Sequence, residues 1–197
     1  MSESESSVID QVTAHLKKAF GDTEPQRASV TFLGLESIDV LRFTGGTDEV
    51  EYVSLGCSRH PMGEPDQIVV DPDVGPRGEI VIRMYASAPL PGLHRSVAML
   101  AAAPAVEGLV LTADALIDLG EPLWKGSRCS AVVLETDPIP PCPLSGDRED
   151  VNFFRAIPVT ANEAAWIRLK GVDALRAAWA EAGIDVRDPA RAGATIG

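Results

Sequence analysis

The order of helix-like and strand-like segments limits this chain to one class of fold. A helical segment near the N-terminus is followed by a block of strands, a second helix, a second block of strands and a helical C-terminal part. In a doubly wound parallel sheet, strands and helices alternate one by one, and this chain shows no such alternation. We therefore expect an α+β fold, with a mixed, mostly antiparallel sheet and helices packed against it.

Local patterns give the expected positions of these elements. Ser7 followed by Asp10, and Thr160 followed by Glu163, are typical helix starts, and Pro104 is expected to end the second helix. The helices are expected at 8–20, 93–102, 161–170 and 172–182. The strands are expected at 29–33, 38–43, 50–55, 67–70, 79–85, 109–111, 115–119, 129–134 and 151–159.

The 197 residues suit one globular domain. We expect a flexible N-terminus at 1–7, a single domain at 8–186 and a C-terminal tail at 187–197. Four prolines between 138 and 143 predict a long surface loop at 135–150, because proline neither donates to a sheet nor continues a helix.

The charge of the chain excludes one class of partner. Lys and Arg number 17 against 29 Asp and Glu, which gives a net charge of −12. Such a surface repels phosphate backbones, so no nucleic-acid partner is expected, and basic proteins are favoured. The start of the chain lacks the pattern of a signal peptide, and no apolar run is long enough to span a membrane. With three widely spaced cysteines, we expect a cytoplasmic protein with reduced thiols and no membrane contact.

Sequence motifs for catalysis, cofactors and metals are missing. There is no phosphate-binding glycine motif, nucleophile elbow or zinc-ligand spacing. The acidic stretch from Asp71 to Glu79 has its Gly and Glu at the wrong positions for a calcium loop. Cys57 and His60 are the one local thiol–imidazole pair, but most single cysteines are small buried residues. We expect no catalytic, cofactor or metal site.

Acidic side chains gather on both sides of the proline-rich loop and in a second loop before it. A solvated acidic loop is the simplest interpretation, and an acidic surface for a basic partner is the functional one. The candidate partner-binding residues are Asp71, Asp73, Glu135, Asp137, Asp147, Glu149 and Asp150.

Several segments, taken in order, resemble the suppressor-of-fused family. Residues 51–58 (Glu-Tyr-Val-Ser-Leu-Gly-Cys-Ser) and 78–84 (Gly-Glu-Ile-Val-Ile-Arg-Met) are similar to two of its strands. The helix at 93–102 and the segment 109–134 follow in the family's order, and residues 151–154, 158–160 and Glu163 resemble its closing strand and helix. The resemblance covers about residues 30 to 180.

This resemblance implies a non-enzymatic binding domain with an α+β fold. Eukaryotic members bind Gli-type transcription factors, with an extended peptide held by strand addition between two domains, and bacterial single-domain members are suspected immunity proteins. The second domain has no counterpart in this sequence, so no partner-contacting residues are carried over, and the chain resembles the bacterial single-domain type.

Three hypotheses remain for the function. The first is a toxin-neutralising partner of the immunity or antitoxin type, steered to a basic toxin by its negative charge. The second is a peptide-binding regulatory module that acts by strand addition. The third, which we rank last, is an enzyme that uses Cys57 with His60 or His94.

Overall fold

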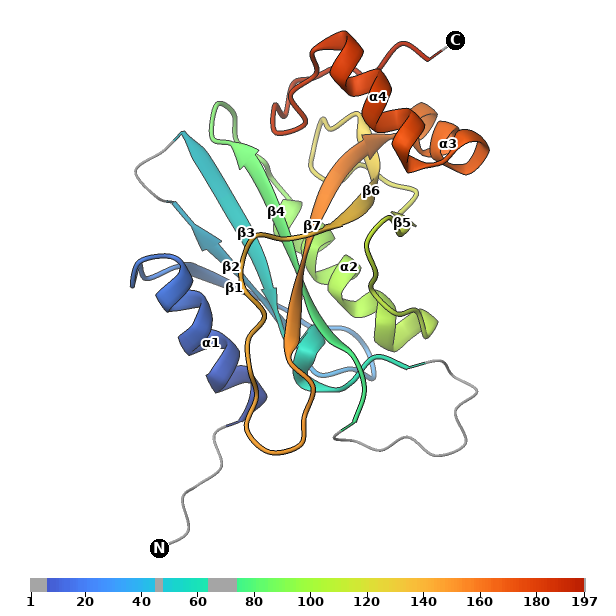
Figure 1. Ribbon diagram of the computed structural model, residues 1–197. Coiled ribbons are helices and arrows are strands. Elements are labelled where there is room, and N and C mark those ends of the chain that lie inside the picture. The colour runs from blue at the N-terminus through green and yellow to red at the C-terminus, as the bar shows by residue number, and fades with distance from the viewer. Residues whose placement is uncertain (1–6, 45–47, 64–73, 197) are drawn as a thin grey trace, which may run out of the picture.

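The computed structural model describes residues 7–44, 48–63 and 74–196. Over these residues the chain forms one sheet flanked by α-helices, with one short 3-10 helix (Figure 1). The helices are α1 (Val8–Ala19), α2 (Leu93–Glu107), α3 (Ala161–Lys170), α4 (Val172–Ala182) and η1 (Cys57–Arg59). The strands are β1 (Gln26–Val30), β2 (Ile38–Phe43), β3 (Glu49–Leu55), β4 (Arg77–Tyr85), β5 (Leu116–Asp118), β6 (Cys129–Thr136) and β7 (Val151–Thr160).

The strand order in the described part of the sheet is β1-β2-β3-β4-β7-β6-β5. All neighbouring strands run antiparallel except β4 and β7, which are parallel. The parallel pair joins the two blocks of strands, which are separated along the chain by α2. The expected α+β class with a mixed, mostly antiparallel sheet is confirmed.

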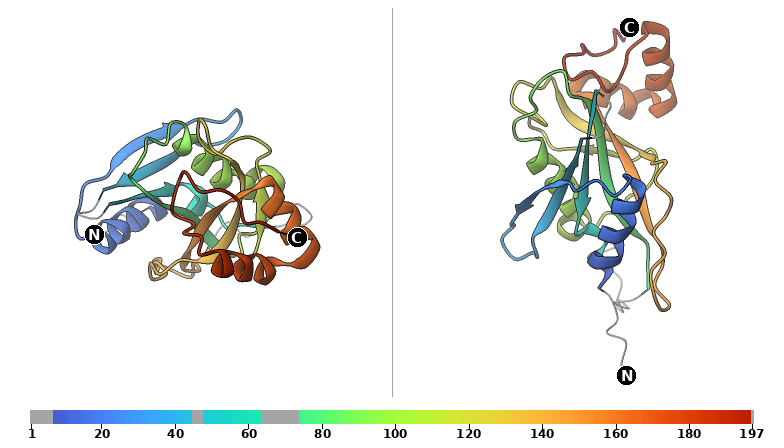
Figure 2. Two further views of the ribbon diagram at one scale, coloured as in Figure 1. Left: turned by 90° about the horizontal axis from the view of Figure 1, so that it is seen from above. Right: turned by 90° about the vertical axis from the view of Figure 1, so that its left-hand side faces the viewer.

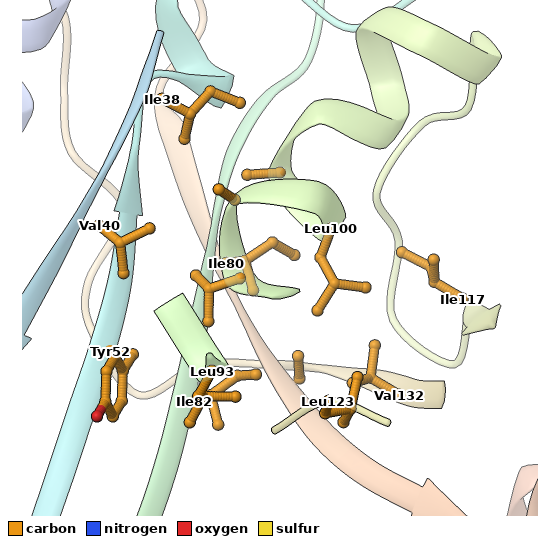
Figure 3. Close-up of a cluster of buried hydrophobic side chains, with 14 of the residues drawn as sticks. Ile38, Val40, Tyr52, Ile80, Ile82, Leu93, Leu100, Ile117, Leu123 and Val132 are labelled. Atoms are coloured by element: carbon orange, nitrogen blue, oxygen red, sulfur yellow. The ribbon is translucent and has the colours of Figure 1, made fainter. Parts of the chain in front are cut away.

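Alternation along the strands divides the core between two faces of the sheet, because successive side chains point to opposite sides. Ile80 and Ile82 lie in the core under α2 (Figure 3), and Val81 lies in the core under α1. On β7, Phe153 belongs to the α1 core, and Ile157 belongs to the core under α3 and α4. Since these two β7 residues share a face, α1 and the α3–α4 pair cover opposite ends of one face, and α2 covers the other.

Helix α2 corrects one expectation. It runs to Glu107 with Pro104 inside it, although Pro104 was expected to end it. Proline deprives the carbonyl of Leu100 of its usual helical donor, but Leu100 and the residues up to Pro104 are buried, and this packing keeps the chain helical. The helix ends at Gly108, which has a positive φ of 67° and donates its N–H to the Pro104 carbonyl at 3.0 Å.

Other expected strands differ from the structure. β1 begins three residues earlier than expected, and residues 109–111 form no strand. The N–H of Leu111 instead lies 3.4 Å from the Met62 sulfur, so it has no strand partner. The strand expected at 67–70 and the flexible N-terminus expected at 1–7, apart from Ser7, lie outside the described residues.

Two segments without regular structure are tied to the core. In the proline-rich loop between β6 and β7, Ile139 and Cys142 are buried under α1, so this loop is only partly a surface loop. Between residues 183 and 196 the chain forms no helix or strand, yet Arg191 and Ala194 are buried. None of the described helices is long and apolar enough to cross a membrane.

Candidate functional site

A buried carboxylate at the start of β4 organises the turn that follows β3. Glu79 is fully buried. Its Oε1 accepts hydrogen bonds from the N–H groups of Gly56 (2.8 Å) and Ser58 (3.0 Å) and from the Ser58 hydroxyl (2.6 Å). Its Oε2 accepts from the Ser54 hydroxyl, which itself accepts the N–H of Ile80 at 2.8 Å. Glu79 thereby satisfies the backbone of a buried turn and fixes η1.

A pocket of about 430 Å³ lies between this turn and the C-terminal end of α2. Its walls are mainly apolar, and three polar side chains, Glu36, Arg59 and His60, also line it. The apolar side chains that line it are Leu35, Ile38, Cys57, Pro61, Met62, Ala101, Ala102, Pro104, Ala105 and Val106.

The Cys57 thiol in this pocket is not activated. Burial raises the pKa of Cys57 well above its ordinary value, and the nearby Glu79 charge raises this pKa further. His60 points its Nε2 at Glu36, 2.9 Å away, and its imidazole is largely exposed. The hydrogen bond from His60 lowers the pKa of Glu36, with a smaller contribution from Arg59. A nucleophilic thiol needs a lowered pKa and a base beside it, so this arrangement gives no support to the hypothesis of a Cys57 enzyme.

We expect Cys57 in the folded protein to react with iodoacetamide at pH 8 at least about ten times more slowly than in the unfolded chain, because the thiolate is the reacting form and burial disfavours it. Peptide mass spectrometry after timed quenching measures the rate, and the same protein in guanidinium chloride is the control. If Cys57 reacts with iodoacetamide at the same rate in the folded and unfolded protein, the claim that burial disfavours its thiolate is wrong.

Strand β1 lies at one edge of the sheet with its outer side unpaired. Among the described residues, its one strand partner is β2. Three of its five residues are exposed, and the edge lies on the outside of the molecule in both views of Figure 2. Three residues beyond the strand, the Leu33 side chain is completely exposed. Unpaired backbone groups on such an edge can take up another strand.

The opposite edge is less open. Strand β5 has three residues, and the carboxylate of Asp118 at its end binds Arg168 of α3 at 2.7 Å. A short edge strand under a helix offers few groups for pairing.

The candidate acidic residues are separated by the fold. Asp137 is buried and forms a bidentate pair with Arg83, so its carboxylate faces the sheet rather than solvent. Glu135 binds Arg176 at 3.1 Å and is half-buried. Asp147, Glu149 and Asp150 are exposed together in the loop before β7. Asp71 and Asp73 lie outside the described residues.

A second buried carboxylate, Glu163, ties the C-terminal segment to the sheet. Its Oε1 accepts from Trp179 Nε1 (2.8 Å), Arg191 Nη1 (2.8 Å) and the Ala194 N–H (3.0 Å). Its Oε2 accepts from Arg191 Nη2 (2.9 Å) and the Thr160 N–H (2.8 Å), which completes the predicted capping box. Burial alone would raise the pKa of Glu163, but these donors, Arg191 first among them, lower it to about 2.

No group of three or more His, Cys, Asp or Glu side chains within the described ranges could hold a metal ion. The structure therefore adds no candidate metal ligands to the site residues above.

Comparison with known proteins identifies the family. A sequence profile described as "Suppressor of fused protein (SUFU)" matches residues 34–192. The chain belongs to the suppressor-of-fused family. Both organising carboxylates, Glu79 and Glu163, lie within the matched part of this suppressor-of-fused domain. No curated protein sequence matches the chain.

Solved structures of the same family share the fold. A suppressor-of-fused homolog from Neisseria gonorrhoeae has a TM-score of 0.65 at 21% identity, over 95% of this chain and 96% of the other. A chain in the crystal structure of the Sufu-Fu complex has a TM-score of 0.64 at 13% identity, over 95% of this chain and 92% of the other. Drosophila Suppressor of Fused has a TM-score of 0.60 at 15% identity, over 84% of this chain and 45% of the other.

The sequence analysis missed three features of the site: the pocket, the role of Glu79 and the free edge of β1. The signal for Glu79 was a carboxylate at the start of a mainly apolar strand, where a buried charge needs dedicated donors. The edge position of β1 had no local signal, because strand order depends on contacts across the whole chain.

Proposed function

We propose that this suppressor-of-fused domain is a protein-binding module that takes up an extended segment of its partner on the free edge of β1. The observation that carries the proposal is this exposed, unpaired strand, which ends beside an exposed leucine. Backbone hydrogen bonds along the edge would supply affinity, and Leu33 would pack against an apolar side chain of the partner. The Sufu-Fu complex, in which a related domain occurs with another protein, supports a protein partner.

The charge of the chain supports a basic partner. With a net charge of −12, association with a basic protein is accelerated at low salt. The exposed carboxylates Asp147, Glu149 and Asp150 are the candidates for contact with it. We include here the hypothesis that the partner is a toxin domain that this protein neutralises, which rests on the family resemblance, the missing catalytic motifs and the negative charge.

The proposed edge is tested with a partner captured from source cells and then purified. Outward-facing amides of β1 exchange rapidly in a free edge strand, and a paired strand protects them. We expect the partner to slow hydrogen exchange at alternate amides of Gln26–Val30. Protection confined to another part of the sheet would refute the proposed edge.

A substitution at Leu33 tests whether the partner binds at the β1 edge. We expect Leu33→Asp to weaken partner binding at least about tenfold, because burying one leucine contributes about 2 kcal/mol. Leu169→Asp is the control, since Leu169 is also exposed but lies on α3, away from β1. Isothermal titration calorimetry of the three proteins measures the difference. Equal losses for both variants would indicate a general effect of charge rather than contact at the edge.

A further inference from the structure

One face of the β1 edge carries complementary charges. Arg27 and Ser29 point to the same side of the strand, and Asp39 on β2 lies directly beside Ser29. Ser29 donates its hydroxyl hydrogen to Asp39. The Arg27 side chain is half exposed, and its Nε lies 3.5 Å from Asp39, with no shorter ion pair to this carboxylate. Arg27 therefore places a positive charge at the open edge, in weak contact with the Asp39 carboxylate on the neighbouring strand β2.

The other face of β1, within its five residues, carries no side chain that would prevent pairing with a second strand. Ala28 pairs with Val40, and Val30 pairs with Ile38, on the side covered by α2. Proteins commonly protect edge strands with proline or inward-pointing lysine, and the five residues of β1 contain neither. The small side chain of Ala28 at the centre of the strand allows close approach of an identical strand.

We propose that two copies of this chain pair through antiparallel β1 strands about a two-fold axis at Ala28. This register places Ala28 against its own copy and Arg27 opposite Ser29 of the partner subunit. Because Asp39 adjoins Ser29, each Arg27 can reach Asp39 of the partner subunit, and the symmetry makes two such ion pairs. The surface is thus self-complementary, as an isologous contact requires.

The pairing is a reversible equilibrium rather than a permanent assembly. One short strand from each copy buries little surface, and two chains of net charge −12 repel each other. An interface of this kind corresponds to a dissociation constant on the order of 100 µM. The dimer covers the edge that the proposed function assigns to the partner protein, so partner and dimer would exclude each other. The pairing itself can be tested without any other protein.

A charge exchange between Arg27 and Asp39 tests the register. In an Arg27→Asp homodimer two carboxylates face each other, and in an Asp39→Arg homodimer two guanidinium groups do. A mixture of the two variants restores both ion pairs. Sedimentation equilibrium at 0.15 M salt is expected to show dimers for the wild type, for the mixture and for the double variant, and at least about tenfold weaker association for each single variant. Arg168→Asp, at the opposite edge, is the control and should associate like the wild type.

A second measurement keeps the test decisive if a variant folds poorly. Alternate amides of Gln26–Val30 in the wild type should exchange more slowly at high than at low protein concentration. A wild type that stays monomeric to about ten times the expected dissociation constant would overturn the proposal. So would single variants that associate as strongly as the wild type, or a mixture of folded variants that does not.

Discussion

Replacing Glu79 with alanine is expected to lower the free energy of unfolding by about 3–5 kcal/mol, close to half the stability of many domains of this size. The carboxylate accepts hydrogen bonds from the N–H groups of Gly56 and Ser58 and from the hydroxyls of Ser54 and Ser58, and all four donors are buried at the end of β3 and in the turn that follows it. Without the acceptor, these donors remain desolvated and unpaired. Urea unfolding followed by circular dichroism measures the loss.

Glu79→Gln is the matched control for this prediction. Its carbonyl oxygen can still accept the two backbone N–H groups, so we expect a loss of about half that of the alanine variant. The alanine variant should also react faster than the wild type at Cys57, because the turn that buries this thiol loses its anchor. Equal stability of wild type and Glu79→Ala would show that the turn does not depend on this carboxylate.

The parts of the fold that the sequence predicted depend on neighbours along the chain. The Ser7 cap and the Thr160–Glu163 capping box join residues three positions apart, and both are confirmed. The alternation along β4 also needs no distant partner, since one strand shows its two faces by itself. The prediction that the helix ends at Pro104 was wrong, because burial of this part of α2 outweighs the local rule that proline ends a helix.

The parts that could not be predicted depend on residues far apart in the chain. Asp137 belongs to an acidic cluster in the sequence, yet it is buried because it meets Arg83, 54 positions away, across the sheet. Glu79 finds its donors 21 to 25 positions earlier. The pocket arises where this turn meets the C-terminal end of α2. Composition and residue spacing do not reveal these long-range contacts, because the order of the strands in the sheet determines them.

Replacing Glu163 with glutamine is expected to lower the free energy of unfolding by about 3 kcal/mol at pH 7 and to remove one component of the acid sensitivity. The pKa of this carboxyl is about 2 in the folded protein, against an ordinary value of 4.5. Above pH 4.5 the carboxylate is ionised in both states, so its full stabilisation by Arg191 and the other donors is present. As the pH falls from about 4.5 to 2, the unfolded chain binds the proton first, and the stabilisation is lost.

The difference in the free energy of unfolding between wild type and Glu163→Gln separates the effect of this carboxyl from that of other titrating groups. Asp185 also has a pKa below its ordinary value, because Arg187 and Tyr85 bind it, but it is present in both proteins and cancels in the difference. The stability difference from urea unfolding should therefore shrink between pH 5 and pH 2.5. Arg191→Ala should raise the pKa of Glu163 and move this loss to higher pH, since Arg191 is its strongest donor. A difference that stays constant over this range would show that the carboxylate charge does not hold the C-terminal segment in place.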